Sequence, residues 1–467
     1  MRAAWLFLLL TPLSAQPYDL VIRNGRVIDP ESGLDAVRHL GISGGKIQVV
    51  SATPLDGRAA IDATGLVVAP GFIDLHSHGQ DAENYRYKAM DGVTTALEME
   101  VGVADVDAWY DKRESQSLIN YGVSIGHIPV RMRMMRDPGN FLPTGDAAHR
   151  AATDPEIAEC RRQIERGLAR GALGVGMGMH YTPAASRWEI LEMFRAATRF
   201  GAACFVHLRY AGDESVAALE EVIAASALTG APVHVAHITS NGLRSTPRLL
   251  GMIAEARARQ LDITTELYPY TAAMSVIESA LFDPGWQSVL GIGYHDLQWT
   301  GSGERLTAES FARYRRTGGG VILHMIPQSA VDAAIASPFV MIASDGGLRN
   351  GKGHPRSSGT FARVLGRYVR ETGALSLAEA IRKMSLMPAQ RLQQRAPAMR
   401  NKGRIREGAD ADLTIFDPAA VTDASTYEDP ARYSIGIRYV LVNGVQVVSD
   451  GKLREVTPGR AVRAAVP

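Results

Sequence analysis

The middle of the chain, from about Pro70 to Pro397, alternates short apolar segments with segments of helical period, and this alternation most constrains the fold. Repeated strand–helix units form a parallel sheet, and about eight of them close into a (β/α)8 barrel. The expected strands are Phe72–His76, Thr94–Glu100, Ser124–Val130, Ala172–Met177, Ala203–His207, Val233–His237, Ile263–Tyr268, Val321–Met325 and Val340–Ser344. The expected helices between them include Pro155–Ala169, Glu189–Phe200, Glu214–Thr229 and Pro247–Gln260. These are nine candidates for the eight strands of a barrel, so we expect one of them, Val321–Met325, to belong to a long insertion after Tyr270.

Both ends of the chain have a different pattern, rich in short strands without a helical period. Leu20–Asp29 and Tyr439–Val448 each contain two strand-like runs about an Asn-Gly pair, which is a hairpin signal. We therefore predict an α/β protein in which residues 16–69 and 398–467 form one small β-sandwich and residues 70–397 form the barrel.

The first fifteen residues have the pattern of a signal peptide. Arg2 precedes the apolar run Ala3–Leu13, and Leu13-Ser14-Ala15 fits a cleavage site before Gln16. The run is too short to span a bilayer, which favours a signal peptide over an uncleaved anchor. We expect a periplasmic or secreted mature protein without a stable membrane anchor.

The charge balance and the cysteine count exclude other classes. There are 50 basic and 49 acidic residues with no basic block, so nucleic acid is not an expected partner. The two cysteines, Cys160 and Cys204, are too few for a disulfide scaffold, and we expect both to be buried free thiols. Composition does not indicate an oligomeric state.

Imidazoles and carboxylates recur at the C-terminal ends of the predicted strands. His76 and His78 are two residues apart at the end of the first strand, so both side chains point to one side. The other residues at strand ends are Glu98, Glu100, His207, His237 and Asp345. Because active sites of such barrels lie at this end of the strands, we expect a metal site there. The ligand types suit zinc, with cobalt, nickel or manganese as alternatives.

Several segments resemble the amidohydrolase superfamily and, within it, the N-acyl-D-amino-acid deacylases (D-aminoacylases). They are Pro70-Gly71-Phe72-Ile73-Asp74-Leu75-His76-Ser77-His78, Gly92-Val93-Thr94-Thr95, Gly171-Ala172-Leu173-Gly174, His207-Leu208-Arg209, Ala236-His237, Ser344-Asp345-Gly346, His354-Pro355-Arg356, Gly359–Gly366 and Gly408–Leu413. The resemblance covers nearly the whole mature chain. It implies a β-sandwich from both termini, a (β/α)8 barrel and a zinc-dependent amide hydrolase.

The resemblance also implies roles for individual residues. His76 and His78 would bind one metal ion together with Asp345, and His207 and His237 would bind a second ion. Asp345 would act as general base toward the attacking water and then pass the proton to the leaving amine.

Other residues are candidates for substrate contact. By the resemblance, Arg356 would hold the substrate's α-carboxylate with its guanidinium fork; a structural salt bridge is the alternative. Tyr181 matches a Tyr-x-Pro element and would donate to the oxyanion. His127, on the predicted third strand, His180 and Arg209 are further candidates for binding substrate.

The sequence departs from the family after the second strand. The family usually has a cysteine ligand in Gly-Asn-Cys-Gly, but Leu97–Gly102 has none, and Val101 falls at its place. We expect Glu100, with Glu98 as the alternative, to bridge the metal ions instead. The alternative bridge, a carboxylated lysine, is also excluded because Ala172–Tyr181 contains no lysine. Whether one or two zinc ions bind is left open.

The preferred interpretation is a hydrolase that cleaves the amide bond of N-acyl amino acids, of D configuration by the resemblance. A dipeptidase or a cyclic amide hydrolase is the alternative with the same site, although Arg356 favours a small-molecule substrate with a free carboxylate. An alternative of another class is a periplasmic metal- or solute-binding protein, against which the general base Asp345 argues. The acyl group, side chain and chirality of the substrate are left open.

Overall fold

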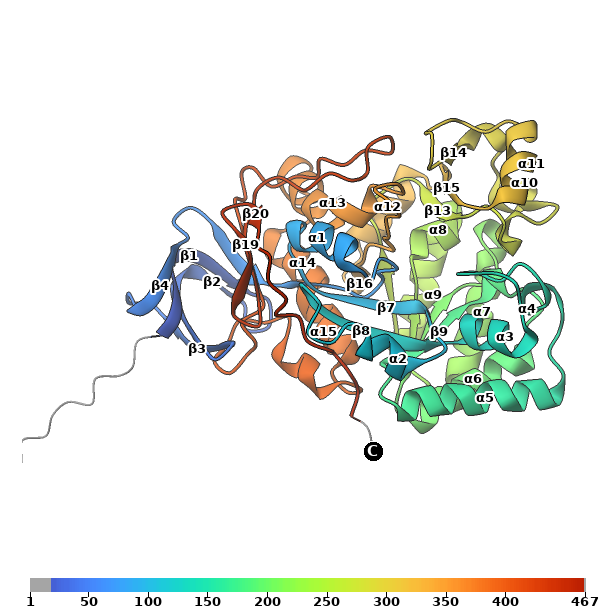
Figure 1. Ribbon diagram of the computed structural model, residues 1–467, viewed down its shortest axis with the longest axis horizontal. Helices are drawn as coiled ribbons and strands as arrows, with labels where there is room; N and C mark the ends of the chain where they lie inside the picture. Colours follow the sequence, from blue (N-terminus) through green and yellow to red (C-terminus); the bar gives the residue numbers. More distant parts are fainter. Residues whose placement is uncertain (1–17, 466–467) are drawn as a thin grey trace, which may run out of the picture.

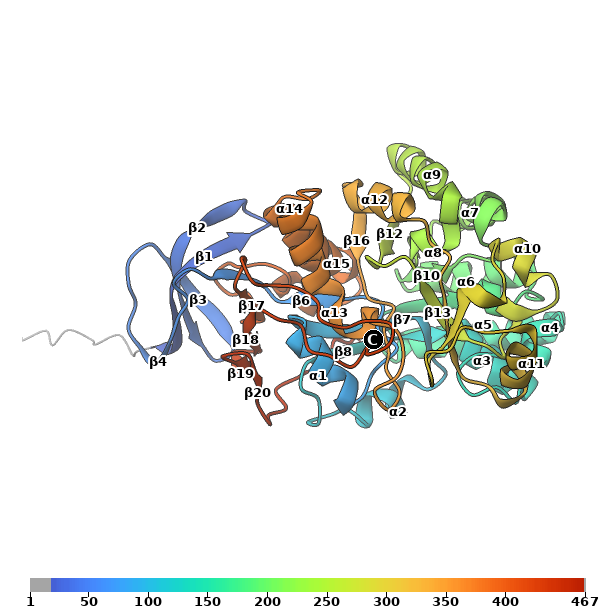
Figure 2. The same ribbon diagram turned by 90° about the horizontal axis from the view of Figure 1, so that it is seen from above.

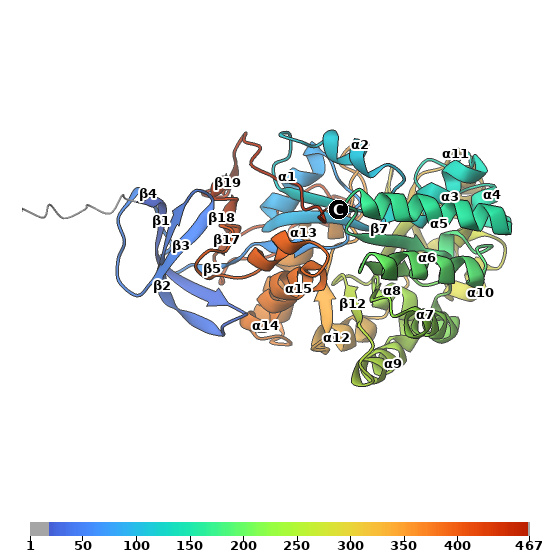
Figure 3. The same ribbon diagram turned by 90° about the horizontal axis from the view of Figure 1, so that it is seen from below.

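The computed structural model describes residues 18–465 and has two parts, a parallel barrel and a sheet built from both ends of the chain (Figure 1). The predicted signal peptide lies outside the described residues. Among residues 18–465, no helix combines the length and the apolar character needed to cross a membrane. In the views from above and below, the terminal sheet lies at one end of the molecule, with the barrel beside it (Figures 2 and 3).

Eight parallel strands form the barrel, in the order β6 to β12 and then β16, and confirm the predicted fold class. They are β6 (Phe72–Asp74), β7 (Val93–Val103), β8 (Asn120–Gly126), β9 (Gly174–Gly178), β10 (Ala203–His207), β11 (Val233–Val235), β12 (Ile263–Leu267) and β16 (Val340–Ile342). Just beyond β6 and β16, Ser77 pairs with Gly346 in parallel, which brings the two edge strands together.

The helices that follow these strands cover the outside of the barrel (Figure 3). The main ones are α1 (Ala82–Met90), α5 (Asp154–Ala169), α6 (Arg187–Arg199), α7 (Ser215–Thr229), α9 (Thr246–Ala258), α12 (Gln328–Ala336) and α13 (Arg356–Arg363). Residues that cap helix starts mark some boundaries, such as Thr153 with Glu156 before α5 and Ser186 before α6.

One predicted strand is wrong in position. Ser124–Val130 was expected as the third strand, but β8 ends at Gly126 and His127 begins helix α3 (His127–Met135). The apolar run has no clear period, so its pattern does not separate strand from helix. Pro129 lies in the first helical turn, where its missing N–H leaves no bond unmade.

The long insertion between β12 and β16 contains the ninth predicted strand, as expected. β15 (Gly320–Leu323) pairs antiparallel with β13 (Ala273–Val276) and β14 (Leu297–Trp299) in a separate three-stranded sheet. This small sheet and helices α10 (Trp286–Leu290) and α11 (Ala308–Thr317) project together from one end of the barrel (Figure 1).

The terminal sheet has nine strands, and they form one continuous hydrogen-bonded sheet. Its strands are β1 (Tyr18–Asp29), β2 (Leu34–Ser43), β3 (Lys46–Ser51), β4 (Gly57–Asp62), β5 (Val67–Pro70), β17 (Leu413–Phe416), β18 (Ile437–Val442), β19 (Val445–Ser449) and β20 (Lys452–Leu453). Strands from both ends share an apolar core that includes Ile22, Leu40 and Leu413. The predicted combination of both termini in one β structure is therefore confirmed.

The two predicted hairpins of this sheet differ in outcome. Asn443-Gly444 makes the expected tight turn between β18 and β19, with positive φ at both residues. Asn24-Gly25 instead lies inside the single strand β1, where the pairing with β2 shifts register. Asn24 has φ +61° there, so the same residue pair makes a bulge because β2 pairs on both sides of it.

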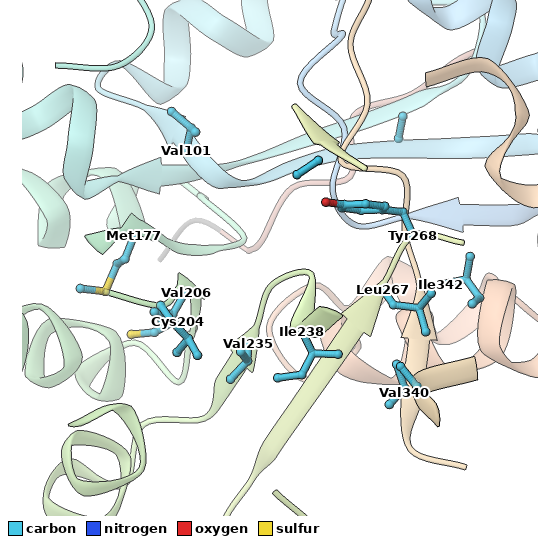
Figure 4. Packing of buried hydrophobic residues seen from close by; sticks show 14 of the residues in the cluster. Val101, Met177, Cys204, Val206, Val235, Ile238, Leu267, Tyr268, Val340 and Ile342 are labelled. Atoms are coloured by element: carbon cyan, nitrogen blue, oxygen red, sulfur yellow. The ribbon is translucent and has the colours of Figure 1, made fainter. Parts of the chain in front are cut away.

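Alternation along the barrel strands sorts side chains between two apolar layers. On β10, Cys204 and Val206 pack outward with Val235, Leu267 and residues of the helices (Figure 4). Phe205, between them, belongs to a second cluster inside the barrel. His207, two residues after Phe205, therefore points inward at the C-terminal end of the strand.

Candidate metal centre and active site

The C-terminal ends of the barrel strands bring six of the predicted residues together. His76 and His78 follow β6, Glu100 lies in β7, His207 ends β10, His237 follows β11 and Asp345 follows β16. All are buried except His78, which is partly exposed. Their ligand atoms form two groups, each compact enough to surround one ion.

The first group consists of His76, His78, Glu100 and Asp345. The Nε2 atoms of the two histidines are 3.2 Å apart. Glu100 Oε2 lies 3.1 Å from His76 Nε2 and 3.3 Å from His78 Nε2. Asp345 Oδ1 lies 3.4 Å and 3.2 Å from the same two nitrogens. Two imidazole nitrogens and two carboxylate oxygens thus face one point.

The second group shares Glu100 with the first. Its other oxygen, Oε1, lies 2.8 Å from His207 Nδ1 and 3.3 Å from His237 Nε2. The structure therefore places Glu100, and not Glu98, between the two groups. Val101, at the place of the family's cysteine, is buried next to Glu100 and lines the cavity beside the site, but its side chain cannot bind metal (Figure 4).

Glu98 lies outside the two ligand groups and contacts His78 and the backbone beside the site. Its Oε2 lies 2.7 Å from His78 Nδ1, and its Oε1 accepts hydrogen bonds from the N–H groups of Val101 and Gly102. The pairing of β7 with β8 shifts register after Glu98, and Gly102 has φ +67° with Ser124 Oγ only 2.4 Å from where a Cβ would be. This irregular stretch requires glycine.

Glu266, on β12, was missed in the sequence. Its Oε1 lies 2.5 Å from His76 Nδ1, and its Oε2 lies 3.2 Å from His234 Nε2. Burial raises the pKa of Glu266, but His76 and His234 outweigh this effect and lower the pKa to about 2. The signal available in the sequence was a carboxylate near the C-terminal end of the predicted strand Ile263–Tyr268, the same end of the barrel as the histidines.

The donor atoms fit divalent metal ions. In the neutral rings, Nδ1–H of His76 donates a hydrogen bond to Glu266, and Nδ1–H of His78 donates one to Glu98. Each Nε2 then directs a lone pair at the centre of the first group. Lone pairs of two nitrogens and two carboxylate oxygens repel one another unless a cation lies between them. Imidazole and carboxylate ligands in this number are those of zinc and similar ions.

Protons can take the place of the cation. Burial lowers the pKa values of His76 and His78, but nearby carboxylates outweigh it and raise both well above the ordinary value. Asp345 and Glu266 have the largest raising effect on His76, and Glu98 has it on His78. Metal ions and protons therefore compete for the same nitrogens.

A buried ion pair joins the first and last strands beneath the site. Asp74 lies 2.9 Å from Lys88 Nζ and accepts hydrogen bonds from the N–H and hydroxyl of Ser344. Asp345 follows with φ +51°, and His237 has φ +29°. Such left-handed conformations at non-glycine residues persist where the surroundings impose them. Asp74 was not identified from the sequence.

Asp345 and Arg356 lie side by side. Arg356 Nη1 is 2.8 Å from Asp345 Oδ2, and the guanidinium lies 4.3 Å from the centre of the Tyr268 ring. Arg356 is 3% exposed, and its Nε has no hydrogen-bond partner among the described residues. Burial raises the pKa of Asp345, but Arg356 and His76 outweigh it and hold the pKa well below its usual range. Asp345 is therefore ionised at neutral pH.

A cavity of about 300 Å³ opens beside these residues, and Glu100, Asp345 and Arg356 line it. Tyr181 and His180 line it as well. Ser275 donates a hydrogen bond to Tyr181 Oη at 3.2 Å, and burial raises the pKa of this phenol, so it stays protonated and can donate. Burial, with the neighbouring His207, lowers the pKa of His180 to about 3, so His180 is neutral.

Two predicted substrate contacts lie elsewhere. His127 Nε2 is 2.8 Å from Glu189 in a fully buried group with Arg131, at the start of α3. Arg209 makes two hydrogen bonds to the carboxylate of Glu221 and others to backbone carbonyls. Neither is among the described residues that line the cavity. The structure therefore does not bring these two predicted substrate contacts to the cavity.

Comparisons with known proteins agree with this geometry. The sequence of residues 59–448 matches the protein family described as the Amidohydrolase family. The chain is 30% identical to a D-aminoacylase of Alcaligenes xylosoxydans xylosoxydans over 96% of this chain and 98% of that protein. It is also 30% identical to an N-acyl-D-glutamate deacylase of the same organism, covering 95% of this chain and 96% of that protein.

A solved structure is similar over the same length. It is an N-acyl-D-glutamate deacylase from Bordetella bronchiseptica complexed with zinc and a phosphonate inhibitor that mimics the tetrahedral intermediate. The TM-score is 0.83 at 27% identity, over 96% of this chain and 100% of that chain.

Proposed function

Because the chain belongs to the amidohydrolase family, we propose that it hydrolyses the amide bond of N-acyl-D-amino acids. It is a metal-dependent enzyme that acts on carbon–nitrogen bonds other than ordinary peptide bonds. One observation carries the substrate proposal: the two ligand groups joined by Glu100 share a cavity with the buried guanidinium of Arg356. A fixed cation beside a hydrolytic centre suits a substrate with a free carboxylate.

Six residues would hold the metal ions. His76, His78 and Asp345 belong to one site, His207 and His237 belong to the other, and Glu100 offers one oxygen to each. When bound, divalent ions polarise an amide carbonyl and lower the pKa of water.

The protein's own groups then have separate tasks. Asp345, which is ionised, accepts a proton from the attacking water and passes it to the nitrogen of the leaving amine. Tyr181, whose phenol is protonated and faces the cavity, donates a hydrogen bond to the oxygen that gains negative charge. Arg356 binds the α-carboxylate and orients the amide. The neutral His180 offers a further hydrogen bond to the substrate.

A substrate screen tests this function. Purified, zinc-loaded protein is assayed with paired D and L forms of N-acetyl amino acids, with dipeptides and with cyclic amides. We expect turnover of the D forms of the N-acetyl amino acids, and its loss in Asp345→Asn. Preferential turnover of dipeptides or cyclic amides would replace this function by that of another amidohydrolase. Tight ligand binding without any turnover would indicate a binding protein.

We also propose that the enzyme acts outside the cytoplasm, in the periplasm or the medium, after removal of residues 1–15. The support is the pattern of the leader, with its cleavage site before Gln16. The near balance of acidic and basic residues supports small-molecule substrates over nucleic acid as partners.

A further inference from the structure

Three polar side chains form a line inside the barrel, behind the metal ligands. They are Thr264 and Glu266 on β12 and His234 on β11. Thr264 and Glu266 are two residues apart, so both point to the same side of the strand. His234 is the register partner of Thr264, and its ring centre lies 5.2 Å from that of Phe205 in the interior apolar cluster. His234 and Glu266 are therefore buried polar residues in the barrel interior.

Each member of this line contacts the next, and the last contact reaches a metal ligand. Thr264 Oγ1 lies 2.8 Å from His234 Nδ1, and His234 Nε2 lies 3.2 Å from Glu266 Oε2. Glu266 Oε1 lies 2.5 Å from His76 Nδ1. The same oxygen accepts a hydrogen bond from the backbone N–H of His237 at 3.5 Å. Glu266 thus contacts one residue from each of the two ligand groups.

The acceptor at the centre of the line determines where its hydrogens lie. An ionised carboxylate only accepts hydrogen bonds, so both imidazoles must turn an N–H toward Glu266. Nε2–H of His234 faces Glu266, and Nδ1 of the same ring accepts the hydroxyl hydrogen of Thr264. Neither Glu266 Oε2 nor His234 Nε2 has an alternative partner among the described residues. One oxygen of Glu266 is therefore held by His234 while the other is directed at His76.

Packing alone does not account for these polar groups. A buried carboxylate and a buried imidazole lose their hydration, and this loss costs free energy. Apolar side chains of similar volume would fill the same space, often with equal or greater stability. What Glu266 and His234 add is a fixed orientation of the His76 ring, whose Nε2 faces His78 and Glu100.

We infer that Glu266, itself held by His234, is a positioning residue that keeps the His76 imidazole oriented for metal binding. This inference rests on the metal-dependent part of the proposed function. Groups that orient a metal-binding histidine in this way commonly contribute about 10- to 100-fold in metal affinity. His234 acts through Glu266, because its ring nitrogens contact only Thr264 and Glu266 among the described residues.

Two substitutions of Glu266 should weaken zinc binding to different extents. Glu266→Gln keeps an oxygen that can accept from His76 but loses the charge, so affinity should fall by about 10-fold. Glu266→Leu removes the acceptor, so affinity should fall by about 100-fold. Competition with a chromophoric chelator measures these affinities. The visible absorption of cobalt(II)-loaded protein reports the ligand geometry and should change in Glu266→Leu.

Glu189→Gln is the matched control. Glu189 is another buried glutamate in contact with a histidine, since its Oε1 lies 2.8 Å from His127 Nε2, but it lies outside both ligand groups. Its replacement should leave zinc affinity and the cobalt spectrum unchanged. Circular dichroism and the Tm of the metal-free variants establish that each is folded, and Glu266→Gln remains the test should Glu266→Leu fail to fold. Unchanged zinc affinity in folded Glu266 variants would overturn the inference.

A double variant tests whether His234 acts through Glu266. His234→Leu alone should lower zinc affinity, but by less than Glu266→Leu. In the Glu266→Leu background the same change should have no additional effect on affinity, because the group that transmits it is absent. A purely structural role would instead lower the Tm additively and leave zinc affinity unchanged. Additive losses of zinc affinity would refute the role given to His234.

These measurements separate the inference from the proposed function. Weaker zinc binding by the Glu266 variants, with no hydrolysis of N-acyl-D-amino acids by the unmodified enzyme, would refute the proposed substrate and support the inference. Hydrolysis by the unmodified enzyme, together with normal zinc affinity in the Glu266 variants, would refute the inference alone. Absence of zinc binding by the unmodified protein would refute both.

Discussion

Replacement of Glu100 by glutamine tests the metal centre most directly. The carboxylate contacts four imidazoles, with His76 and His78 on one oxygen and His207 and His237 on the other. Glutamine keeps the size but turns one oxygen into an NH₂ group, which donates hydrogen bonds and cannot bind metal. One of the two ligand groups must therefore lose a ligand and face a donor instead.

The expected loss of metal affinity in Glu100→Gln can be judged against the loss expected for the neighbouring Glu98. Glu98 contacts only the outer nitrogen of His78, at 2.7 Å. Losing such an orienting group commonly lowers metal affinity by about 10- to 100-fold. Loss of a direct ligand should exceed the upper end of that range, roughly 100-fold, or about 2.8 kcal/mol. Glu98→Gln makes the same change in charge and is the matched control.

The assay measures metal content by elemental analysis after dialysis, and affinity by competition with a chromophoric chelator. We expect Glu100→Gln to retain fewer ions per chain than Glu98→Gln, with the larger loss of kcat/KM. Circular dichroism and the Tm of both variants establish that they are folded. If Glu98→Gln loses more metal than Glu100→Gln, or if neither loses any, the bridging role of Glu100 is refuted.

Four further predictions follow from the site and the leader. Asp345→Asn should lower kcat by roughly 10²–10⁴-fold, because it removes the proton acceptor. A near-normal rate constant for hydrolysis in single-turnover assays would contradict this role. Arg356→Lys should raise KM for substrates with a free carboxylate more than for their amides, whereas equal effects would mean that Arg356 only positions Asp345. The pKa values of metal-free His76 and His78 are raised, so zinc must displace protons there: affinity in chelator titrations should fall as pH is lowered, and a pH-independent affinity would contradict the geometry. The mature protein from the cell envelope or medium should begin at Gln16 by mass spectrometry, and a retained leader in the membrane fraction would indicate an anchor.

The sequence by itself determined the architecture, because periodicity is a local property. Helices α5, α6, α7 and α9 lie where the helical period predicts them. The His-x-His pair and the polar residues at strand ends predicted the metal ligands, because parallel strands bring their C-terminal ends to one edge. The sequence pattern predicted the wrong local structure at two places where it was ambiguous. The third predicted strand continues into what is helix α3, and Asn24-Gly25 forms a bulge within β1 instead of a hairpin turn.

Only the tertiary structure decided which polar atoms meet. Glu98 and Glu100 lie on the same side of the strand by period, but in the fold Glu98 contacts backbone N–H groups and the outer nitrogen of His78. Glu100 instead lies between the inner nitrogens of the histidines. His127 and Arg209 are predicted substrate contacts, but the fold places both outside the described residues that line the cavity. Glu266 lies 190 residues from His76 in the chain, and no local signal joins them. Leu281 and Leu323 likewise line the cavity from the insertion between β12 and β16, whose position depends on long-range packing that periodicity does not encode.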